Sequence, residues 1–148
     1  MSKNNSEFAA RLLAVQACYE MLQTKRALKL LVEEYLERGL EIDGEYEAKA
    51  KPKPSLFKEI IKQLDENLGQ SLSLFEEHAR TSEKDVESLL KAIALCGITE
   101  LHNNHKVETA LIIDEYLNVT HCFYEKGQVS YINGILDAVK QNARNAVA

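Results

Sequence analysis

Residues 86–101 read VESLLKAIALCGITEL, and this stretch decides the expected fold. Its apolar side chains follow one another so closely that little polar surface is left, which is typical of a helix buried on nearly all sides. We predict a helix from about residue 82 to 102 and expect it to be the most buried in the protein. Ser82 and Asp85 have the spacing of a capping box, which satisfies free amide groups at a helix start. The helix is therefore expected to begin there.

Helical periodicity continues on both sides of this stretch. Apolar residues recur in steps of three and four over residues 6–23, 25–38, 55–79, 107–124 and 129–143. Gly69 marks a possible break, and Gly127 is expected to separate the last two helices. The fold class is therefore all-α, with six or seven helices in two packed three-helix subdomains. We expect these subdomains to occupy residues 1–80 and 81–148.

Composition agrees with a helical protein and gives a first indication of its partners. The chain has 148 residues, which suits one compact domain, and it contains only two prolines and six glycines. An aromatic content of 7% without Trp is low for an all-β barrel. The net charge of −5 should repel a polyanion, so composition by itself gives no reason to expect nucleic-acid binding.

The sequence predicts a cytoplasmic protein without a membrane span. No stretch reaches the roughly 18 consecutive apolar residues that a span needs, and no cationic start precedes an apolar block. Cys18, Cys96 and Cys122 are an odd number of cysteines outside CxxC pairs. They are expected to be reduced and packed in the interior, without a disulfide framework.

Two strings near the ends of the chain resemble a known family. AVQACY at residues 14–19 resembles the AVQALY segment of the first helix of the NusB family of bacterial transcription antitermination factors. YINGILD at residues 131–137 resembles the FVNGVLD signature of that family. Glu100-Leu101 and residues 113–115 fall where the family has its YEL and INEA segments.

This resemblance implies a fold and a function. The NusB family is all-helical, is built from two three-helix subdomains, is not enzymatic and uses no cofactor. Together with NusE, a ribosomal small-subunit protein, its members bind boxA-type RNA. They thereby help the elongating RNA polymerase to resist termination, especially on ribosomal RNA operons.

The resemblance also implies roles for individual residues. Arg11 matches one position of an arginine-rich run that meets RNA phosphates, and Tyr131 matches an aromatic that lies against RNA. Tyr19 matches an aromatic at the NusE interface, and Leu90 stands where an acidic contact is common. The candidate RNA-binding residues are Lys3, Arg11, Gln16, Tyr131 and Asn133, and the candidate partner-binding residues are Tyr19 and Leu90.

The chain departs from the family at several of its cationic positions. Phe8 and Ala9 replace two arginines, Ser130 replaces a frequent lysine and Leu95 replaces a helix arginine. These replacements support an alternative function, in which a protein-interaction module keeps the NusB fold with a weakened or lost RNA site. Binding of RNA and of NusE separates the two hypotheses.

Some candidate residues also have a purely structural interpretation. The Gln16 amide is as well suited to holding two helices together as to contacting a base. Tyr131 has helical spacing with Ile135, which is typical of a core aromatic. Tight helix packing is the preferred explanation for Gly134 within a predicted helix. The helix over residues 107–124 is expected to point Leu111 inward, among other apolar residues.

Other chemistry is less well supported. His102, His105, His121 and Cys122 include zinc-ligand types but lack the spacing of a four-ligand site, so no metal site is predicted. The neighbouring carboxylates Asp114 and Glu115 point about 100° apart on a helix, which favours capping of another helix over catalysis. The lysine run within residues 49–62 is either a nucleic-acid contact or a solvated surface.

Overall fold

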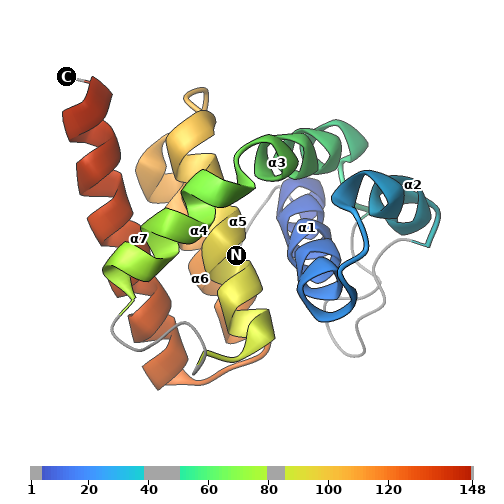
Figure 1. Cartoon of the computed structure of the whole chain (residues 1–148). Coiled ribbons are helices and arrows are strands. Elements are labelled where there is room, and N and C mark those ends of the chain that lie inside the picture. Colours follow the sequence, from blue (N-terminus) through green and yellow to red (C-terminus); the bar gives the residue numbers. More distant parts are fainter. Residues whose placement is uncertain (1–4, 39–50, 80–85, 148) are drawn as a thin grey trace.

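The computed structural model describes residues 5–38, 51–79 and 86–147, which form seven helices and no strand (Figure 1). The helices are α1 (Asn5–Thr24), α2 (Leu28–Arg38), α3 (Pro54–Glu66), α4 (Leu68–His78), α5 (Ser88–Asn103), α6 (Thr109–His121) and α7 (Lys126–Val147). The predicted all-α class is confirmed. Within the described ranges, every helix is too short or too polar to cross a membrane.

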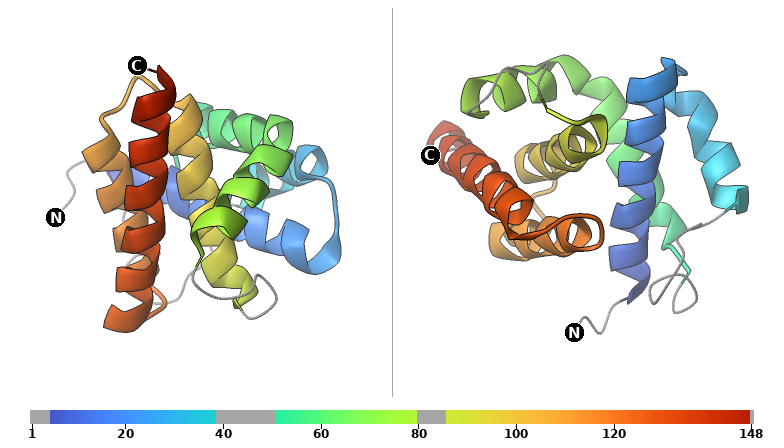
Figure 2. Two further views of the ribbon diagram at one scale, coloured as in Figure 1. Left: turned by 60° about the vertical axis from the view of Figure 1, so that its left-hand side comes forward. Right: turned by 90° about the horizontal axis from the view of Figure 1, so that it is seen from below.

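Helix α5 lies at the centre of the fold. Figure 2 shows it between α1 on one side and α7 on the other, and it also contacts α3, α4 and α6. All residues from Ala92 to Leu101 are buried, which confirms the predicted burial of this helix. The helix begins at Ser88, later than expected, and the predicted capping residues Ser82 and Asp85 lie outside the described residues.

Helix α1 is the second central helix, although its sequence predicts only one inward face. Residues 9–15 are all buried, and so are Ala17 and Cys18, because α1 is in contact with α2, α3, α5 and α6. Alanine side chains are small enough to let a neighbouring helix approach closely on several sides. Their small size also gives them a weak hydrophobic signal in the sequence, which explains why this burial was not predicted.

The predicted helix over residues 55–79 is divided at Asn67 into α3 and α4. The Asn67 side-chain amide donates to the carbonyl oxygen of Gln63 at 2.8 Å, and the Asn67 backbone N–H donates to the same oxygen. Such local side-chain bonds compete with regular helix geometry. Gly69, the expected break, lies inside α4.

The packing of α4 links the two halves of the sequence. This helix precedes residue 80, yet it contacts α5 and α7 in addition to α3. The division into subdomains of residues 1–80 and 81–148 therefore stays a prediction from the sequence, and α4 belongs to the second group of helices by its contacts.

The last two helices differ from their predicted description in two respects. Leu111 is 49% exposed, so the expectation that it points inward is wrong, whereas Ile112 and Tyr116, which were not predicted to be inside, are fully buried. Gly127 does not separate the helices but lies in the first turn of α7, which begins at Lys126. A glycine is well tolerated there because first-turn amides lack intrahelical partners in any case.

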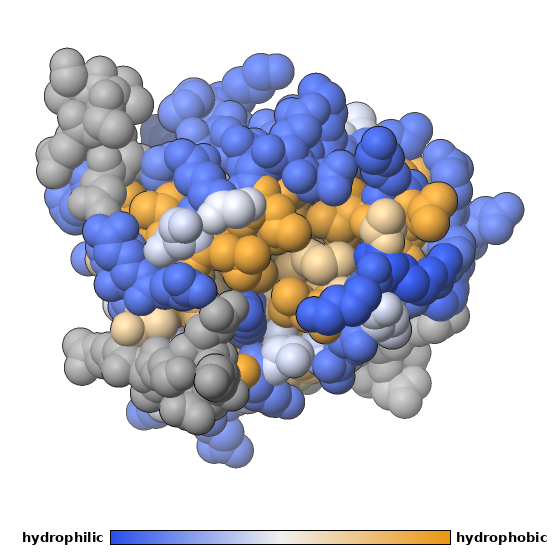
Figure 3. Space-filling model, in the orientation of Figure 1, coloured by the Kyte–Doolittle hydropathy of each residue, from blue (hydrophilic) through white to orange (hydrophobic). Residues whose placement is uncertain are grey.

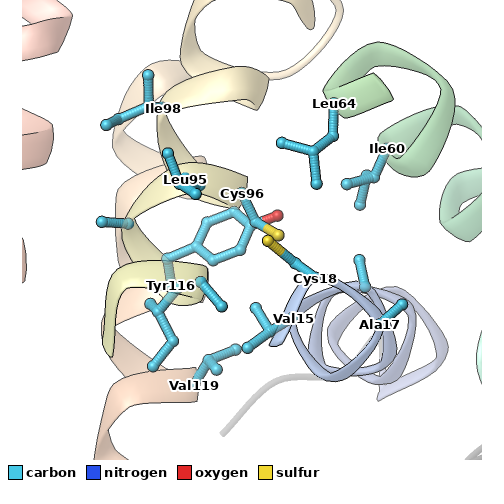
Figure 4. Packing of buried hydrophobic residues seen from close by; sticks show 14 of the residues in the cluster. Val15, Ala17, Cys18, Ile60, Leu64, Leu95, Cys96, Ile98, Tyr116 and Val119 are labelled. Carbon is cyan, nitrogen blue, oxygen red and sulfur yellow. The ribbon is translucent and has the colours of Figure 1, made fainter. Parts of the chain in front are cut away.

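One continuous apolar core joins the helices. Figure 4 shows side chains of α1, α3, α5 and α6 meeting at its centre, where Cys18 and Cys96 lie beside Tyr116. Because the same core contains residues from both ends of the chain, separation of α1 from α5 would expose much of it.

Candidate functional site

The predicted phosphate contact Arg11 lies in the interior. Its side chain is 2% exposed and forms a two-pronged ion pair with Glu100, in which Nε donates to Oε1 at 2.7 Å and Nη2 donates to Oε2 at 2.9 Å. Nη1 donates to Oε1 of Glu115 at 3.2 Å. The guanidinium group is therefore occupied by two carboxylates of α5 and α6.

Glu100 accepts two further hydrogen bonds, from the Tyr116 hydroxyl at 2.7 Å and from the Asn104 side-chain amide at 2.9 Å. We call Arg11, Glu100, Asn104, Glu115 and Tyr116 the Arg11 cluster. The buried Glu100 carboxylate is thus surrounded by four hydrogen-bond donors from three side chains. The Arg11 cluster therefore fastens α1 to α5 and α6 at a single point.

The electrostatics of the Arg11 cluster keep the positive charge inside. Burial opposes the charged form of Arg11 most strongly, but the hydrogen bond to Glu100 and the electrostatic attraction of Tyr116, Glu100 and Glu115 together outweigh it and raise the pKa of the guanidinium. Burial raises the pKa of Glu115, and the nearby Arg11 opposes that rise. Glu115 thus serves as an ion-pair partner of Arg11 and not in the helix-capping role predicted for it.

This geometry does not agree with the role expected for Arg11. A phosphate contact needs a cation that reaches solvent with free donors, whereas the donors of Arg11 point at Glu100 and Glu115. The sequence places Arg11 on α1 without showing which way it points. The two carboxylates that turn it inward are distant in the chain.

The second site is a groove around Tyr131. It lies between the start of α5 and the start of α7, and we call it the Tyr131 groove. Its lining residues are Val86, Glu87, Leu90, Tyr124, Gly127, Gln128 and Tyr131. Tyr131 also lines an adjoining hollow with Gly127, Ser130, Gly134 and Ile135. The structure thus brings together Leu90 and Tyr131, which the sequence assigned to different partners.

Tyr19 lies near the same groove. It has an electrostatic interaction with Tyr124, which lines the groove, and its own hydroxyl accepts a hydrogen bond from Gln23 Nε2 at 3.1 Å. Tyr124 in turn donates from its hydroxyl to the Glu87 carboxylate. Burial, followed by this hydrogen bond, raises the pKa of Tyr124, so the phenol stays protonated and keeps donating.

Tyr131 offers its ring to the groove rather than its hydroxyl. The side chain is half-buried and packs against the core, and its hydroxyl oxygen is inaccessible and has no hydrogen-bond partner among the residues that the structure describes. The two interpretations of this tyrosine, core packing and a surface for stacking, therefore both describe parts of the same ring.

The remaining predicted RNA-binding residues are dispersed. Gln16 is half-buried on α1, and its backbone carbonyl accepts a hydrogen bond from the Tyr35 hydroxyl at 3.4 Å. Asn133 is exposed on α7, about 200° around the helix from Tyr131, so it does not share the groove. Lys3 lies outside the described residues.

The expectation of tight helix packing at Gly134 is wrong. A Cβ atom placed on Gly134 meets nothing within 4 Å, and the residue is exposed. Gly97 is the glycine that packing requires, since a Cβ atom there would lie 2.9 Å from Cδ2 of Leu136. Because Gly134 has no side chain, the surface of α7 beside Tyr131 is open, and none of the described residues fills the space.

Sequence reasoning did not single out Glu87, Tyr124 and Gln128. The available signal was a pair of tyrosines, Tyr124 and Tyr131, on either side of the turn before α7. Leu95, which replaces a family arginine, is fully buried in α5. Leu95 therefore contributes apolar contacts to the core of this protein.

The two remaining candidate sites are a metal site and the lysine run within residues 49–62. Within residues 5–38, 51–79 and 86–147, no three His, Cys, Asp or Glu side chains are grouped so as to hold a metal ion. In the lysine run, Lys53 forms an ion pair with Glu7, and Lys62 forms one with Glu66. Lys58 is exposed. Both interpretations of the run stay open, and its part within residues 49–50 lies outside the described residues.

Comparisons with known proteins agree with the end signatures. A model of the NusB family matches residues 9–141. A transcription antitermination protein NusB of Novosphingobium aromaticivorans is 30% identical over 140 residues, covering 92% of this chain and 93% of the relative. Proteins of the same name from Bartonella henselae and Allorhizobium ampelinum are 34% and 32% identical, each over 95% of this chain and over 90% and 89% of the relatives. The matched range contains both the Arg11 cluster and the Tyr131 groove.

Proposed function

Because the chain belongs to the NusB family, we propose that it is a non-enzymatic, RNA-binding transcription antitermination factor that acts in the cytoplasm. The observation that carries this proposal is the family match over residues 9–141, which includes the Tyr131 groove. We propose boxA-type RNA and NusE as its direct partners. The elongating RNA polymerase is then reached indirectly, through these two.

The RNA site that we propose is centred on Tyr131. Its ring lines two adjoining hollows, and a base can stack on a phenol face without using the hydroxyl. Ser130 has a small side chain and Gly134 has none, so an RNA backbone can approach α7 closely there. Asn133 is exposed nearby and can contact polar base edges from another side of the helix.

Arg11 has a different part in this proposal from the one implied by the resemblance. Its ion pairs with Glu100 and Glu115 hold α1 in place, so it positions the helix that carries Gln16 and Tyr19. Phosphate neutralisation is left to other cations. Lys3 stays a proposed phosphate contact, because nothing tests its placement.

NusE is proposed to bind beside the RNA, through Tyr19 and Leu90. Tyr19 is half-buried and interacts electrostatically with Tyr124, which lines the same groove as Leu90. Figure 3 shows a band of apolar side chains on the face where α4 lies, bordered by hydrophilic residues; because α4 carries neither Tyr19 nor Leu90, this band is a second candidate surface for a protein partner. Exposed apolar surface of this kind is typical of a protein interaction site.

The test of the proposal is a titration of fluorescently labelled boxA RNA with the full chain, alone and with NusE. We expect preference for boxA over a scrambled RNA, and tighter binding when NusE is present. Absence of a boxA preference in both titrations would contradict the RNA part of the proposal. Failure of NusE to bind at all, measured in the same series, would contradict the partner.

A matched set of variants locates the site. Tyr131→Ala should weaken boxA binding by about 5- to 150-fold, the range for loss of one base–aromatic stack. Tyr131→Phe should leave the affinity unchanged, because the hydroxyl makes no hydrogen bond. Leu111→Ala, on the exposed side of α6, is the control and should bind like the unchanged protein. Equal effects of Tyr131→Ala and Leu111→Ala would place the RNA elsewhere.

A second candidate function is a protein-interaction module that keeps the NusB fold and lacks the RNA site. The observation that favours it is the burial of Arg11 between two carboxylates, which removes a cation from the surface of a chain with net charge −5. On this reading, NusE binding survives Tyr131→Ala and RNA is not bound. Salt-dependent boxA binding, with the logarithm of the affinity falling by about 0.7 per phosphate contact for each unit of log salt, would reject it.

A further inference from the structure

Two buried cysteines meet in the core between α1 and α5. Cys18 and Cys96 are 78 positions apart in the sequence, which is more than half of the 148-residue chain, and both are fully buried. Figure 4 shows their sulfur atoms facing each other between the two helices. The pair joins the two most buried helices of the fold at the point where the N-terminal and C-terminal parts of the sequence pack together.

We propose that Cys18 and Cys96 form a modification site, at which an oxidant of the peroxide class converts the two thiols into a disulfide that ties α1 to α5. The third cysteine, Cys122, is excluded from this pair because it lies at the end of α6 and is half-buried near the surface. The proposed function in transcription does not use the pair, so the two proposals stand or fall separately.

The reaction balances with hydrogen peroxide alone. The Cys18 sulfur attacks one peroxide oxygen, the O–O bond breaks, and the leaving hydroxide takes up the thiol proton as water. The Cys96 sulfur then attacks the sulfenic acid sulfur, the S–S bond forms, and the S–O bond breaks to release a second water. Each sulfur loses one electron overall, and the peroxide is reduced to two water molecules.

The surroundings decide the rate of these steps. The neighbouring Cys18 thiol and burial raise the pKa of the Cys96 thiol, so little of the reactive thiolate is present while the core is closed. Neither sulfur is in contact with solvent, so the oxidant reaches the pair only when α1 and α5 separate locally. The reaction is therefore slow, and the disulfide preserves the closed arrangement once it has formed.

The experiment uses the full chain with Cys122→Ser, which removes the surface thiol. The folded protein is incubated with hydrogen peroxide, its remaining thiols are alkylated, and its peptides are mapped by mass spectrometry without reduction. We expect one cross-linked peptide pair, Cys18 with Cys96, and a melting temperature raised by at least about 5 °C over the reduced protein. Reduction with a dithiol should reverse both changes.

Two controls make the result decisive. The unchanged chain, oxidised in guanidinium chloride, should give all three pairings of its cysteines, whereas the folded chain should give only Cys18 with Cys96. Cys18→Ala in the Cys122→Ser background should give no intramolecular cross-link. The proposal is overturned if the folded protein keeps Cys18 and Cys96 reduced after prolonged exposure, or if either is converted only to sulfinic acid. Peptide mapping of the unchanged chain gives the same decision if a variant fails to fold.

Discussion

Replacement of Arg11 by methionine tests the role that the structure gives to this residue. Methionine keeps most of the apolar stem and removes the guanidinium, which leaves Glu100 and Glu115 in the interior without a cation. Glu100 keeps its hydrogen bonds from Tyr116 and Asn104, but two of its four donors are lost. The free energy of unfolding should therefore fall sharply.

The magnitude follows from the cost of breaking a buried ion pair on one side, which is about 3 to 5 kcal/mol. Arg11 donates three charge-assisted hydrogen bonds, and each contributes about 1.5 to 3 kcal/mol to the free energy of unfolding. The sum of these three contributions exceeds the cost of a broken pair. The actual loss is smaller than the sum, because the carboxylates left without Arg11 can take up protons. We therefore expect a loss of about 4 kcal/mol at neutral pH, a large fraction of the stability of a domain.

Urea unfolding followed by circular dichroism measures this loss, and the double variant Arg11→Met/Glu100→Met supplies the matched control. Removal of Arg11 and Glu100 together should recover part of the stability, because one buried carboxylate is removed with the cation while Glu115 stays in the interior without Arg11. Lower pH should reduce the loss in Arg11→Met, since a carboxyl whose pKa is raised by burial destabilises the fold only while it is ionised. A loss below about 1 kcal/mol in Arg11→Met, or no recovery in the double variant, would refute the buried-cation reasoning.

Three further predictions concern stability. Burial raises the pKa of Glu115, so the folded state binds more protons and stability declines as pH rises above the ordinary value of 4.5; Glu115→Gln should flatten that decline in urea midpoints measured from pH 4 to 8. Gly97→Ala should lower the free energy of unfolding by about 1 kcal/mol, because its methyl group would lie 2.9 Å from Leu136, while Gly134→Ala should raise it by up to about 1 kcal/mol through helix propensity. Thermal melts should therefore show a lower melting temperature for Gly97→Ala and a higher one for Gly134→Ala, and equal shifts would contradict the packing difference. Lys25 follows α1 at φ 64°, so Lys25→Gly should stabilise the protein by about 0.5 kcal/mol in urea titrations, and a loss would contradict strain there.

The fold was largely predictable because its strongest signals are local. The run of large apolar residues in 86–101 predicts a buried helix, and α5 is that helix. Errors occurred where the side chains carry little hydrophobic signal or where a polar side chain acts on the backbone. The alanines of α1 conceal its burial, and Asn67 ends α3 two residues before the glycine that was expected to do so.

The candidate site was predictable only in part, because its residues come from distant parts of the sequence. The signature at residues 131–137 indicated Tyr131, and Leu90 was taken from the family's partner interface. Leu90 and Tyr131 line one groove only because α5 packs against α7, and no local sequence pattern specifies that packing. Tyr124 and Glu87 complete the groove through a hydrogen bond between residues 37 positions apart.

Arg11 shows most clearly how a matched residue can differ from its expected role. A net charge of −5 argues against polyanion binding, but binding depends on the local potential and not on the total charge, so one arginine in the expected cationic run would favour RNA if its charge faced solvent. The local potential, however, includes Glu100 and Glu115, which take up the charge of Arg11 inside the protein. The surface that would meet RNA is therefore less cationic than the sequence suggests, and aromatic stacking on Tyr131 must supply a larger share of any affinity. A partner that adds cations beside the Tyr131 groove would then be a requirement for tight binding and not merely an aid to it.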